Sequence, residues 1–225
     1  MGKNLISQRR GRGSAIFRTP SFRYPGKAGF PKPTDRKMEG SITKLIHSQG
    51  HSTPLMNVNF KDNSVLIQAP EGIAEGTTIE AGKDAAVKTG NILPLIKIPE
   101  GTPVFNIEAT PGDGGKFVRA GGTFGRVVSK VGGKVTVLLP SKREKTFLPE
   151  CRAMIGISAG SGRKEKPFLK AGIRFHNMKK KNKRYPKVCG VSMNAVAHPF
   201  GSGGSHTKGR PTQASRHAPP GRKVG

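Results

Sequence analysis

The sequence predicts a mostly β protein, with two small β-barrels in tandem between long irregular basic extensions at both ends. Short runs rich in Val, Ile and Phe alternate with glycine or polar breaks from about Met38 onward, a pattern typical of strands. Almost no helical periodicity accompanies them, and short strands at regular spacing favour small barrels. The 31 glycines and 18 prolines among 225 residues indicate a chain that is globular in part and irregular in part.

The first barrel is expected at residues 38–90. Strands are predicted in four runs, namely SITKLIHS (41–48), LMNVNF (55–60), VLIQAP (65–70) and GTTIEAG (76–82). The run PEGIAEG joins the last two and supplies a turn. Between Ser41 and Gly90 the chain carries four basic and five acidic residues, which indicates a fold-forming module more than a charged binding surface.

The second barrel is expected at residues 91–160. Its clearest hairpin signal is RVVSKVGGKVTVLLP (126–140), two β-branched runs around Gly132 and Gly133. Pro149 and Glu150 are expected to start a single helical turn. The run ATPGDGGKFVRAGGTFGR (109–126) is glycine-dense like a phosphate loop, but it lacks the GxxxxGK[ST] spacing. We therefore expect this loop to approach an RNA backbone closely and not to bind a nucleotide.

Positive charge is concentrated at the two ends of the chain. The protein has 40 Lys and Arg against 13 Asp and Glu, a net charge of +27. Residues 1–40 contribute +8, residues 41–160 contribute +4 and residues 161–225 contribute +15. This balance favours nucleic acid as the partner. An anionic membrane surface is the lesser explanation, because no segment approaches the roughly 20 apolar residues of a membrane span.

The cysteines and the N-terminal sequence indicate the cellular compartment in which the protein is expected. Cys151 and Cys189 do not make a disulfide framework, and the chain has no CxxC pair for zinc. The basic N-terminus lacks the apolar region of a secretory signal. We expect a reducing compartment.

The N-terminal extension, residues 1–37, is broken by prolines and glycines and shows no helical or strand periodicity. Its arginines alternate with Phe17, Phe22, Tyr24 and Phe30, a mixture that contacts phosphates and stacks on bases. The extension is expected to be ordered by RNA; a disordered basic tail is the alternative.

The C-terminal extension, residues 161–225, contains no carboxylate after Glu165. A surface so positive needs an external polyanion. At its centre lies KVCGVSMNAVAHPFGSGG (187–204), a small-residue run whose last glycines allow backbone N–H groups to approach phosphates. The KKKNKR run at 179–184 is interpreted as neutralising phosphates, with a solvated charge run or localisation patch as the alternative.

The residues predicted to contact RNA share positive charge, an amide or imidazole donor, or glycine flexibility. They are Arg9, Arg10, Arg12, Arg18, Arg23, Lys116, Arg119, Arg163, Lys164, Arg174, Lys179, Lys180, Lys181, Lys183, Arg184, Lys187, Asn194, His198, Gly201, Gly203, Gly204, Lys208, Arg210, Arg216, Arg222 and Lys223.

Catalysis is not expected. His198 has no acid nearby in sequence, and a Cys–His pair with Cys189 would need a third group to orient it. His198, His206 and His217 lack the close spacing typical of a zinc site. We expect no cofactor, no metal and no small-molecule substrate. Two alternatives to a structural RNA-bound protein are a general basic nucleic-acid-binding protein and an RNA-acting enzyme using His198.

Four runs in order and spacing resemble the universal large-subunit ribosomal protein L-two family. They are GNILPLIKIPEGTPVFNIEATPGDGGKFVRAGGTFG (90–125), LPECRAMIG (148–156), KAG (170–172) and GVSMNAVAHPFG (190–201). The resemblance covers about residues 38–204. The final APPGRKVG and the short basic N-terminus are similar to the archaeal and eukaryotic branch.

The resemblance implies an oligonucleotide-binding (OB) barrel followed by an SH3-like barrel, with both extensions in ribosomal RNA. It also implies a structural constituent of the cytoplasmic large ribosomal subunit, part of the ribonucleoprotein that carries out translation. Such a protein stabilises RNA near the peptidyl-transferase region and supports subunit association. Large-subunit RNA and neighbouring ribosomal proteins are the implied partners; neither a membrane nor a second copy of the chain is expected.

The sequence departs from the usual family pattern around the histidine. Ala197 stands where the family generally has an acid before the histidine carried over as His198, and Cys189 stands where arginine is common. The loop GSGGSH also lacks an uninterrupted GGG. Because an acid would orient the imidazole or raise its pKa, its loss weakens any acid–base role of His198.

Overall fold

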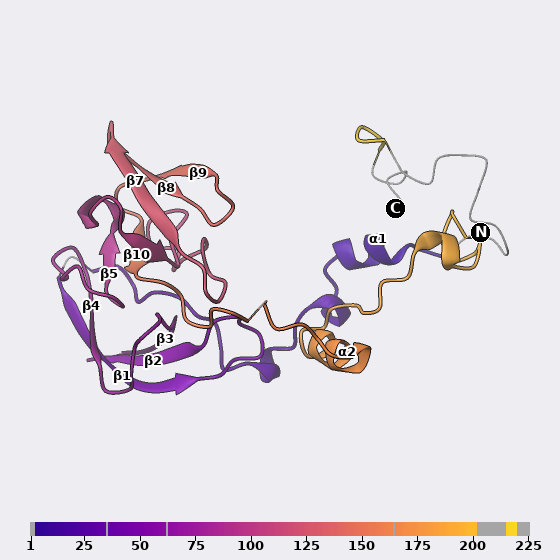
Figure 1. Ribbon diagram of the computed structural model, residues 1–225, viewed down its shortest axis with the longest axis horizontal. Coiled ribbons are helices and arrows are strands. Elements are labelled where there is room, and N and C mark those ends of the chain that lie inside the picture. Colours follow the sequence, from indigo (N-terminus) through magenta and orange to yellow (C-terminus); the bar gives the residue numbers. More distant parts are fainter. Residues whose placement is uncertain (1–2, 35, 62, 164, 202–214, 220–225) are drawn as a thin grey trace. The chain divides into compact units, whose positions relative to one another are not determined.

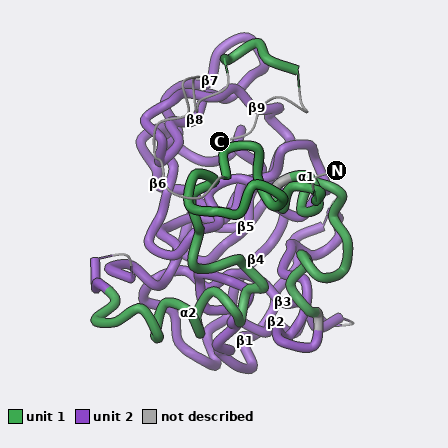
Figure 2. The backbone as a smooth tube through the Cα atoms, turned by 90° about the vertical axis from the view of Figure 1, so that its right-hand side faces the viewer, with its two compact units in different colours: residues 1–20, 168–225 green, residues 21–167 purple. Residues whose placement is uncertain are grey.

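The short β-branched runs of the sequence become strands of one continuous sheet in the computed structural model. It describes residues 3–34, 36–61, 63–163, 165–201 and 215–219. The chain divides into two units, coloured separately in Figure 2. Unit 1 combines Met1–Pro20 with Phe168–Gly225, and unit 2 is Ser21–Pro167. The two chain ends, predicted as separate extensions, therefore belong to the same unit.

Unit 2 contains all ten strands of the described chain. They are β1 (Met38–Ile46), β2 (Leu55–Phe60), β3 (Asn63–Gln68), β4 (Thr78–Ala81), β5 (Ile92–Pro94), β6 (Pro103–Phe105), β7 (Gly125–Val131), β8 (Lys134–Leu138), β9 (Glu144–Phe147) and β10 (Arg152–Ile155). Their order is β3-β2-β1-β4-β5-β10-β6-β7-β8-β9. Only the β4–β5 pair is parallel among these neighbours. The predicted mostly β fold class is confirmed.

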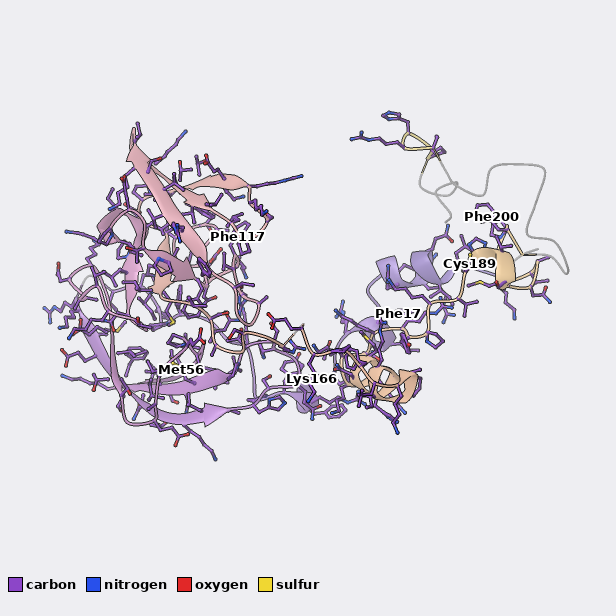
Figure 3. All side chains as sticks on the ribbon, in the orientation of Figure 1. Phe17, Met56, Phe117, Lys166, Cys189 and Phe200 are labelled. Carbon is purple, nitrogen blue, oxygen red and sulfur yellow. The ribbon has the colours of Figure 1, made fainter. Side chains whose placement is uncertain are left out.

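The buried apolar side chains of unit 2 form two hydrophobic cores. The first core contains Met56 and its neighbours from β1 to β4, while the second contains the buried residues of β7, β8 and β9. Figure 3 labels Met56 in the first core and Phe117 beside the second. Two cores in tandem are consistent with an OB-like barrel followed by an SH3-like barrel.

Three short strands, β5, β6 and β10, lie between the cores and serve both. In β10, Ala153 faces the second core and Met154 the first, because successive side chains of a strand point to opposite faces. Val104 and Phe105 in β6 divide in the same way. This explains why the middle of the sequence shows continuous apolar runs and no alternation. Figure 1 shows β5 and β10 between the β1–β3 and β7–β9 groups.

The predicted boundary at residues 90 and 91 lies in the connection between β4 and β5, two strands that pair with each other in the same sheet. Residues 24–31, predicted as part of the N-terminal extension, also pack on this unit: Phe30 belongs to the first core, and the Gly29 N–H donates to Leu66 O at 2.9 Å. The residue limits of the two barrels remain predictions.

The hairpin around Gly132 and Gly133 is confirmed as β7–β8, with Val131 paired to Lys134. The helical turn predicted to start at Pro149 and Glu150 is wrong. These residues form a tight turn that leads into strand β10. The reason is tertiary: the Ile96 N–H donates to Pro149 O (3.2 Å) and the Leu95 N–H to Cys151 O (2.9 Å), which aligns this segment for the sheet.

Helices occur where the sequence showed no periodicity. They are α1 (Ile6–Gly11) and α2 (Ala171–Lys180) in unit 1, and short 3₁₀ turns at η1 (Ala15–Phe17), η2 (Ser21–Arg23), η3 (Leu95–Lys97) and η4 (Gly190–Ser192). No residue of α2 is buried, which explains the missing apolar stripe. Neither described helix has the length and apolar character needed to span a membrane.

Candidate nucleic-acid interface

The two units differ more in their acidic and basic residues than the segments 1–40, 41–160 and 161–225 do. All 13 carboxylates of the chain fall in unit 2, at residues 21–167. Unit 1 has 18 Lys and Arg and no Asp or Glu. Because opposite charges are absent from its sequence, unit 1 depends on counter-ions from outside itself. It is the main candidate interface.

Helix α2 is the most regular cationic element of unit 1. It begins after Lys170, which adopts an extended conformation, and ends in the basic residues Lys179 and Lys180. Cations at a helix C-terminus are favourable because the last carbonyls carry partial negative charge. The Arg174 guanidinium lies over the Tyr185 ring at 5.1 Å from its centroid, which fixes one arginine beside an aromatic surface.

Most predicted RNA-contact residues have accessible side chains. Exposed residues in the described chain are Arg9, Arg10, Arg12, Arg18, Lys116, Arg163, Arg174, Lys179, Lys180, Lys183, Arg184, Lys187, Asn194 and Arg216. Arg23, Arg119, Lys181 and His198 are half-buried, and Gly201 is buried. Lys164, Gly203, Gly204, Lys208, Arg210, Arg222 and Lys223 lie outside the described residues. RNA contact by these residues remains a prediction.

The guanidinium of Arg119 is hydrogen-bonded within unit 2. It donates to Gly115 O at 3.1 Å and to Ala28 O at 2.9 Å, so it ties residues of the N-terminal region to the glycine-rich loop. Burial lowers the pKa of Arg119, and the negative charge of Asp113 partly counters this effect. Arg119 thus has fewer donors left for a phosphate than the exposed arginines of unit 1.

The glycine-rich loop at 109–126 directs its backbone donors inward. The N–H groups of Ala109, Thr110 and Gly115 donate to the Asp113 carboxylate at 3.0, 3.2 and 3.0 Å. The Gly114 N–H donates to Glu108 Oε1 at 3.1 Å. These N–H groups are therefore already bonded to internal carboxylates. The loop resembles a phosphate loop because it binds anions, but those anions belong to the protein.

His198 has a defined tautomer. Its Nδ1 accepts a hydrogen bond from the Phe200 N–H at 3.1 Å, so the ring proton of the neutral imidazole lies on Nε2. The ring packs directly on Gly190, where any Cβ would overlap it. His198 is thereby fixed as a hydrogen-bond donor through Nε2, which suits a phosphate or base acceptor.

Gly201 is required by the local turn. Its N–H donates to His198 O at 2.9 Å, and a Cβ at this position would overlap the carbonyl oxygens of Met193 and Asn194. Asn194 supports the same turn by accepting from the Val196 N–H at 3.1 Å. The sequence analysis predicted RNA contacts for Asn194 and Gly201; in the structure these two residues shape the backbone around His198.

The described residues contain no cluster of three or more His, Cys, Asp or Glu able to hold a metal ion. Cys151 is buried in the second core, and burial raises the pKa of its thiol. Cys189 is exposed and lies in unit 1, where the sequence supplies no carboxylate. Its burial and raised pKa make Cys151 a poor nucleophile.

Asn182 was missed as a site residue, because the lysine run around it was interpreted through charge alone. It is the residue of positive φ (+51°) that follows α2. The available signal was an asparagine just after a basic segment, which is a common helix stop. Lys3 and Lys170, both exposed in unit 1, were also left out of the prediction.

A sheet unit with internal charge pairing joined to an all-cationic unit defines a nucleic-acid-binding scaffold protein. Residues 88–218 match the family model of the C-terminal domain of ribosomal proteins L2. The large ribosomal subunit protein uL2 of Archaeoglobus fulgidus is 50% identical over all of this chain and 95% of its own length. The proteins of the same name from Methanosphaera stadtmanae and Methanothermobacter thermautotrophicus are 50% and 47% identical, each over 100% of this chain and 95% of the relative. The chain therefore belongs to the ribosomal protein L2 family.

Proposed function

We propose that this protein is a structural constituent of the large subunit of the cytoplasmic ribosome and that it binds and stabilises large-subunit RNA. The observation that carries the proposal is the composition of unit 1, with 18 cationic residues and no carboxylate. Phosphate groups supply the counter-charges that the sequence of this unit lacks. Family membership supports the ribosome as the source of that RNA.

Unit 2 and unit 1 have different tasks in this proposal. Unit 2 is a scaffold in which two guanidinium groups are bonded internally, that of Arg152 to a carboxylate and that of Arg119 to backbone carbonyls. Unit 1 neutralises phosphate repulsion where RNA helices converge. In keeping with the family resemblance, we place this RNA near the peptidyl-transferase region and assign the protein a role in subunit association. Neighbouring ribosomal proteins are the further partners.

An RNA-acting enzyme using His198 is less well supported. Nδ1, the nitrogen that would accept a proton, already accepts the Phe200 N–H. A general basic nucleic-acid binder would need only charge, whereas unit 2 is a shaped sheet with two cores. We therefore retain the structural role and propose no catalytic residue.

Sucrose-gradient sedimentation of the tagged full-length protein from lysate tests the proposal. The gradients are run in low and high salt, and the RNA in each fraction is identified. Comigration with large-subunit RNA that survives moderate salt is expected. Release by mild salt as free protein with mixed RNA or DNA would overturn the ribosomal role and favour the general binder.

A further inference from the structure

Among the residues that the structure describes, four buried side-chain atoms have no hydrogen-bond partner, and all four belong to unit 2. They are Gln68 Oε1, Asn106 Oδ1, Asn106 Nδ2 and Arg119 Nε. Gln68 is 2% exposed and Asn106 is fully buried, so bulk solvent does not reach these groups. Burying a polar atom without a partner is costly, and most such atoms in proteins are bonded to a neighbour or to an ordered water.

The three side chains meet at the end of the glycine-rich loop. Gln68 Nε2 donates to Arg119 O at 2.9 Å. The Asn106 N–H donates to Val118 O at 2.9 Å, and the Asn106 side chain lies on Gly115, where any Cβ would overlap Oδ1. Arg119 Nη1 donates back to Gly115 O at 3.1 Å. Gln68, Asn106 and Arg119, here called the polar cluster, are therefore linked to one another through this stretch of backbone.

The four atoms of the polar cluster comprise two acceptors and two donors. The orientation of the Gln68 amide is fixed because its nitrogen donates to Arg119 O, which leaves Oε1 as an acceptor. The Asn106 amide presents one acceptor and one donor in either of its orientations. The Arg119 Nε–H is a donor only. A water molecule has the complementary set, since it can donate two hydrogen bonds and accept two.

An ion fits the polar cluster less well than water does. A metal cation would face the Arg119 guanidinium and the donor of Asn106, and the described chain contains no group of three His, Cys, Asp or Glu that could hold one. An anion would face two amide oxygens, which cannot donate to it. A negative charge is also already present beside the cluster, because Asp113 accepts from the Gly115 N–H at 3.0 Å.

We propose that the polar cluster binds an internal water molecule, held by Gln68 Oε1, the Asn106 amide and the Arg119 Nε–H. The water joins three parts of unit 2, namely the end of β3, the residue after β6 and the glycine-rich loop. Arg119 is thereby a positioning residue: with its Nε held, its Nη2 donates to Ala28 O at 2.9 Å and keeps the N-terminal region on unit 2. The site does not depend on the proposed function, because all of its ligands lie in unit 2.

Nuclear Overhauser effects between water and the isotope-labelled full-length protein test the proposal. In the wild type, the Arg119 Nε–H and the Asn106 side-chain amide are expected to show cross-peaks to water with the sign of a long-lived complex. Rotating-frame measurements separate these cross-peaks from hydrogen exchange. Absence of a long-lived water at either group would overturn the site.

The diagnostic variant is Gln68→Met, which keeps a side chain of similar length and removes the Oε1 acceptor. We expect the water cross-peak of the Arg119 Nε–H to be lost. Thr53→Val is the matched control, because Thr53 Oγ1 also donates to Arg119 O, at 3.3 Å, but is not an atom of the polar cluster. Its water cross-peak should remain. A cross-peak that persists in Gln68→Met, or that is lost equally in Thr53→Val, would overturn the assignment of Gln68 as a ligand of the water. If Gln68→Met does not fold, the wild-type cross-peaks decide.

Exchange of chloride for bromide in the buffer distinguishes the water from a bound anion. The two halides differ in size, so an anion in the polar cluster would shift the Arg119 Nε–H resonance when one replaces the other. We expect this resonance to stay unchanged. A shift that saturates with bromide would overturn the water in favour of an anion.

Discussion

Unit 2 and unit 1 deal with positive charge in opposite ways. In unit 2 the buried Arg152 guanidinium donates to Glu108 Oε1 at 2.7 Å and to Pro31 O at 2.8 Å, so its charge is satisfied within the protein. Unit 1 has no Asp or Glu in its sequence, so it cannot balance its own 18 Lys and Arg in this way. The comparison teaches that net charge alone does not single out a candidate RNA interface. The absence of internal counter-ions distinguishes unit 1 as that candidate.

The two units also differ in what holds them together. Unit 2 has two buried clusters of apolar side chains. In the described part of unit 1 only Leu5, Gly201 and Ala218 are buried. So little burial does not offset the conformational entropy of ordering a chain of this length. Changes in unit 2 should therefore alter unfolding, while changes in unit 1 should alter RNA affinity and its salt dependence.

The largest expected effect comes from neutralising the cations at residues 179–184. Replacing Lys179, Lys180, Lys181, Lys183 and Arg184 by Gln removes five candidate phosphate contacts. We expect the slope of log K against log salt to fall by about 3.5–4.5, with a loss of affinity near 0.1 M salt of about a thousand-fold or more. Binding of full-length protein to large-subunit RNA, titrated at several salt concentrations, measures the slope.

The matched control replaces five exposed lysines of unit 2, namely Lys44, Lys61, Lys88, Lys97 and Lys134. It removes the same net charge, so it corrects for long-range attraction. A salt slope that falls equally in both variants would remove the distinction between the units.

Glu108→Gln should give the largest effect on stability. Glu108 is fully buried and accepts bonds from Arg152 and from the Gly114 N–H. Glutamine would leave the buried Arg152 charge unpaired and place an amide N–H₂ against other donors. We expect a loss of about 3–5 kcal/mol in the free energy of unfolding. Urea unfolding followed by circular dichroism measures it.

Glu144→Gln serves as the control for that substitution, since Glu144 is exposed on β9. Its unfolding free energy should change by no more than about 0.5 kcal/mol. An equally small change for Glu108→Gln would mean that the Arg152 pair does not stabilise unit 2.

Gly115→Ala tests whether the glycine-rich loop is built for internal packing. The new Cβ would overlap the buried Asn106 side chain, and Gly115 has φ of +94°. Gly132→Ala, at φ of +59° in the β7–β8 turn, meets nothing within 4 Å. We expect a loss of about 2–4 kcal/mol for Gly115→Ala from overpacking and strain together. Strain alone should reduce the stability of Gly132→Ala by about 1 kcal/mol. Equal losses in parallel unfolding titrations would contradict the packing role.

Much of unit 2 could be predicted from the sequence because its signals are local. The run at 55–60 is β2 with the same limits, and the Gly132–Gly133 hairpin follows from turn chemistry. Strand β10 was not predicted, because residues that serve two cores show no alternation and Pro149 suggested a helix start. Its strand conformation is decided by long-range pairing with β5 and β6.

The candidate interface likewise has features that local sequence predicts and features that depend on long-range contacts. The cationic character of residues 179–184 is readable from composition, since charge needs no partner to be recognised. The contact between Asn182 and Arg18 joins residues 164 positions apart, and no local pattern encodes it. The sequence also could not show that the backbone N–H groups at 109–115 bind Asp113. A glycine-rich loop has the same composition whether it binds a phosphate or a carboxylate of the protein itself.

The smallest expected effect is a pH dependence at Asp113. Burial would raise the pKa of this carboxyl, but hydrogen bonds from the Gly115, Ala109 and Thr110 N–H groups, with Lys116 nearby, hold it below its usual value. A lowered folded-state pKa means that the stabilisation is complete above the unfolded pKa of about 3.9 and is lost as pH falls through the folded value. Asp113→Asn cannot titrate and keeps one acceptor oxygen, so it should be less stable than the wild type by about 1 kcal/mol at pH 7. That gap should stay constant from pH 5 to about pH 4 and narrow as urea titrations are carried to lower pH, toward the folded pKa. A gap that stayed constant at the lower pH as well would show that the loop does not depend on the carboxylate charge, and the loop amides would again be candidates for phosphate binding.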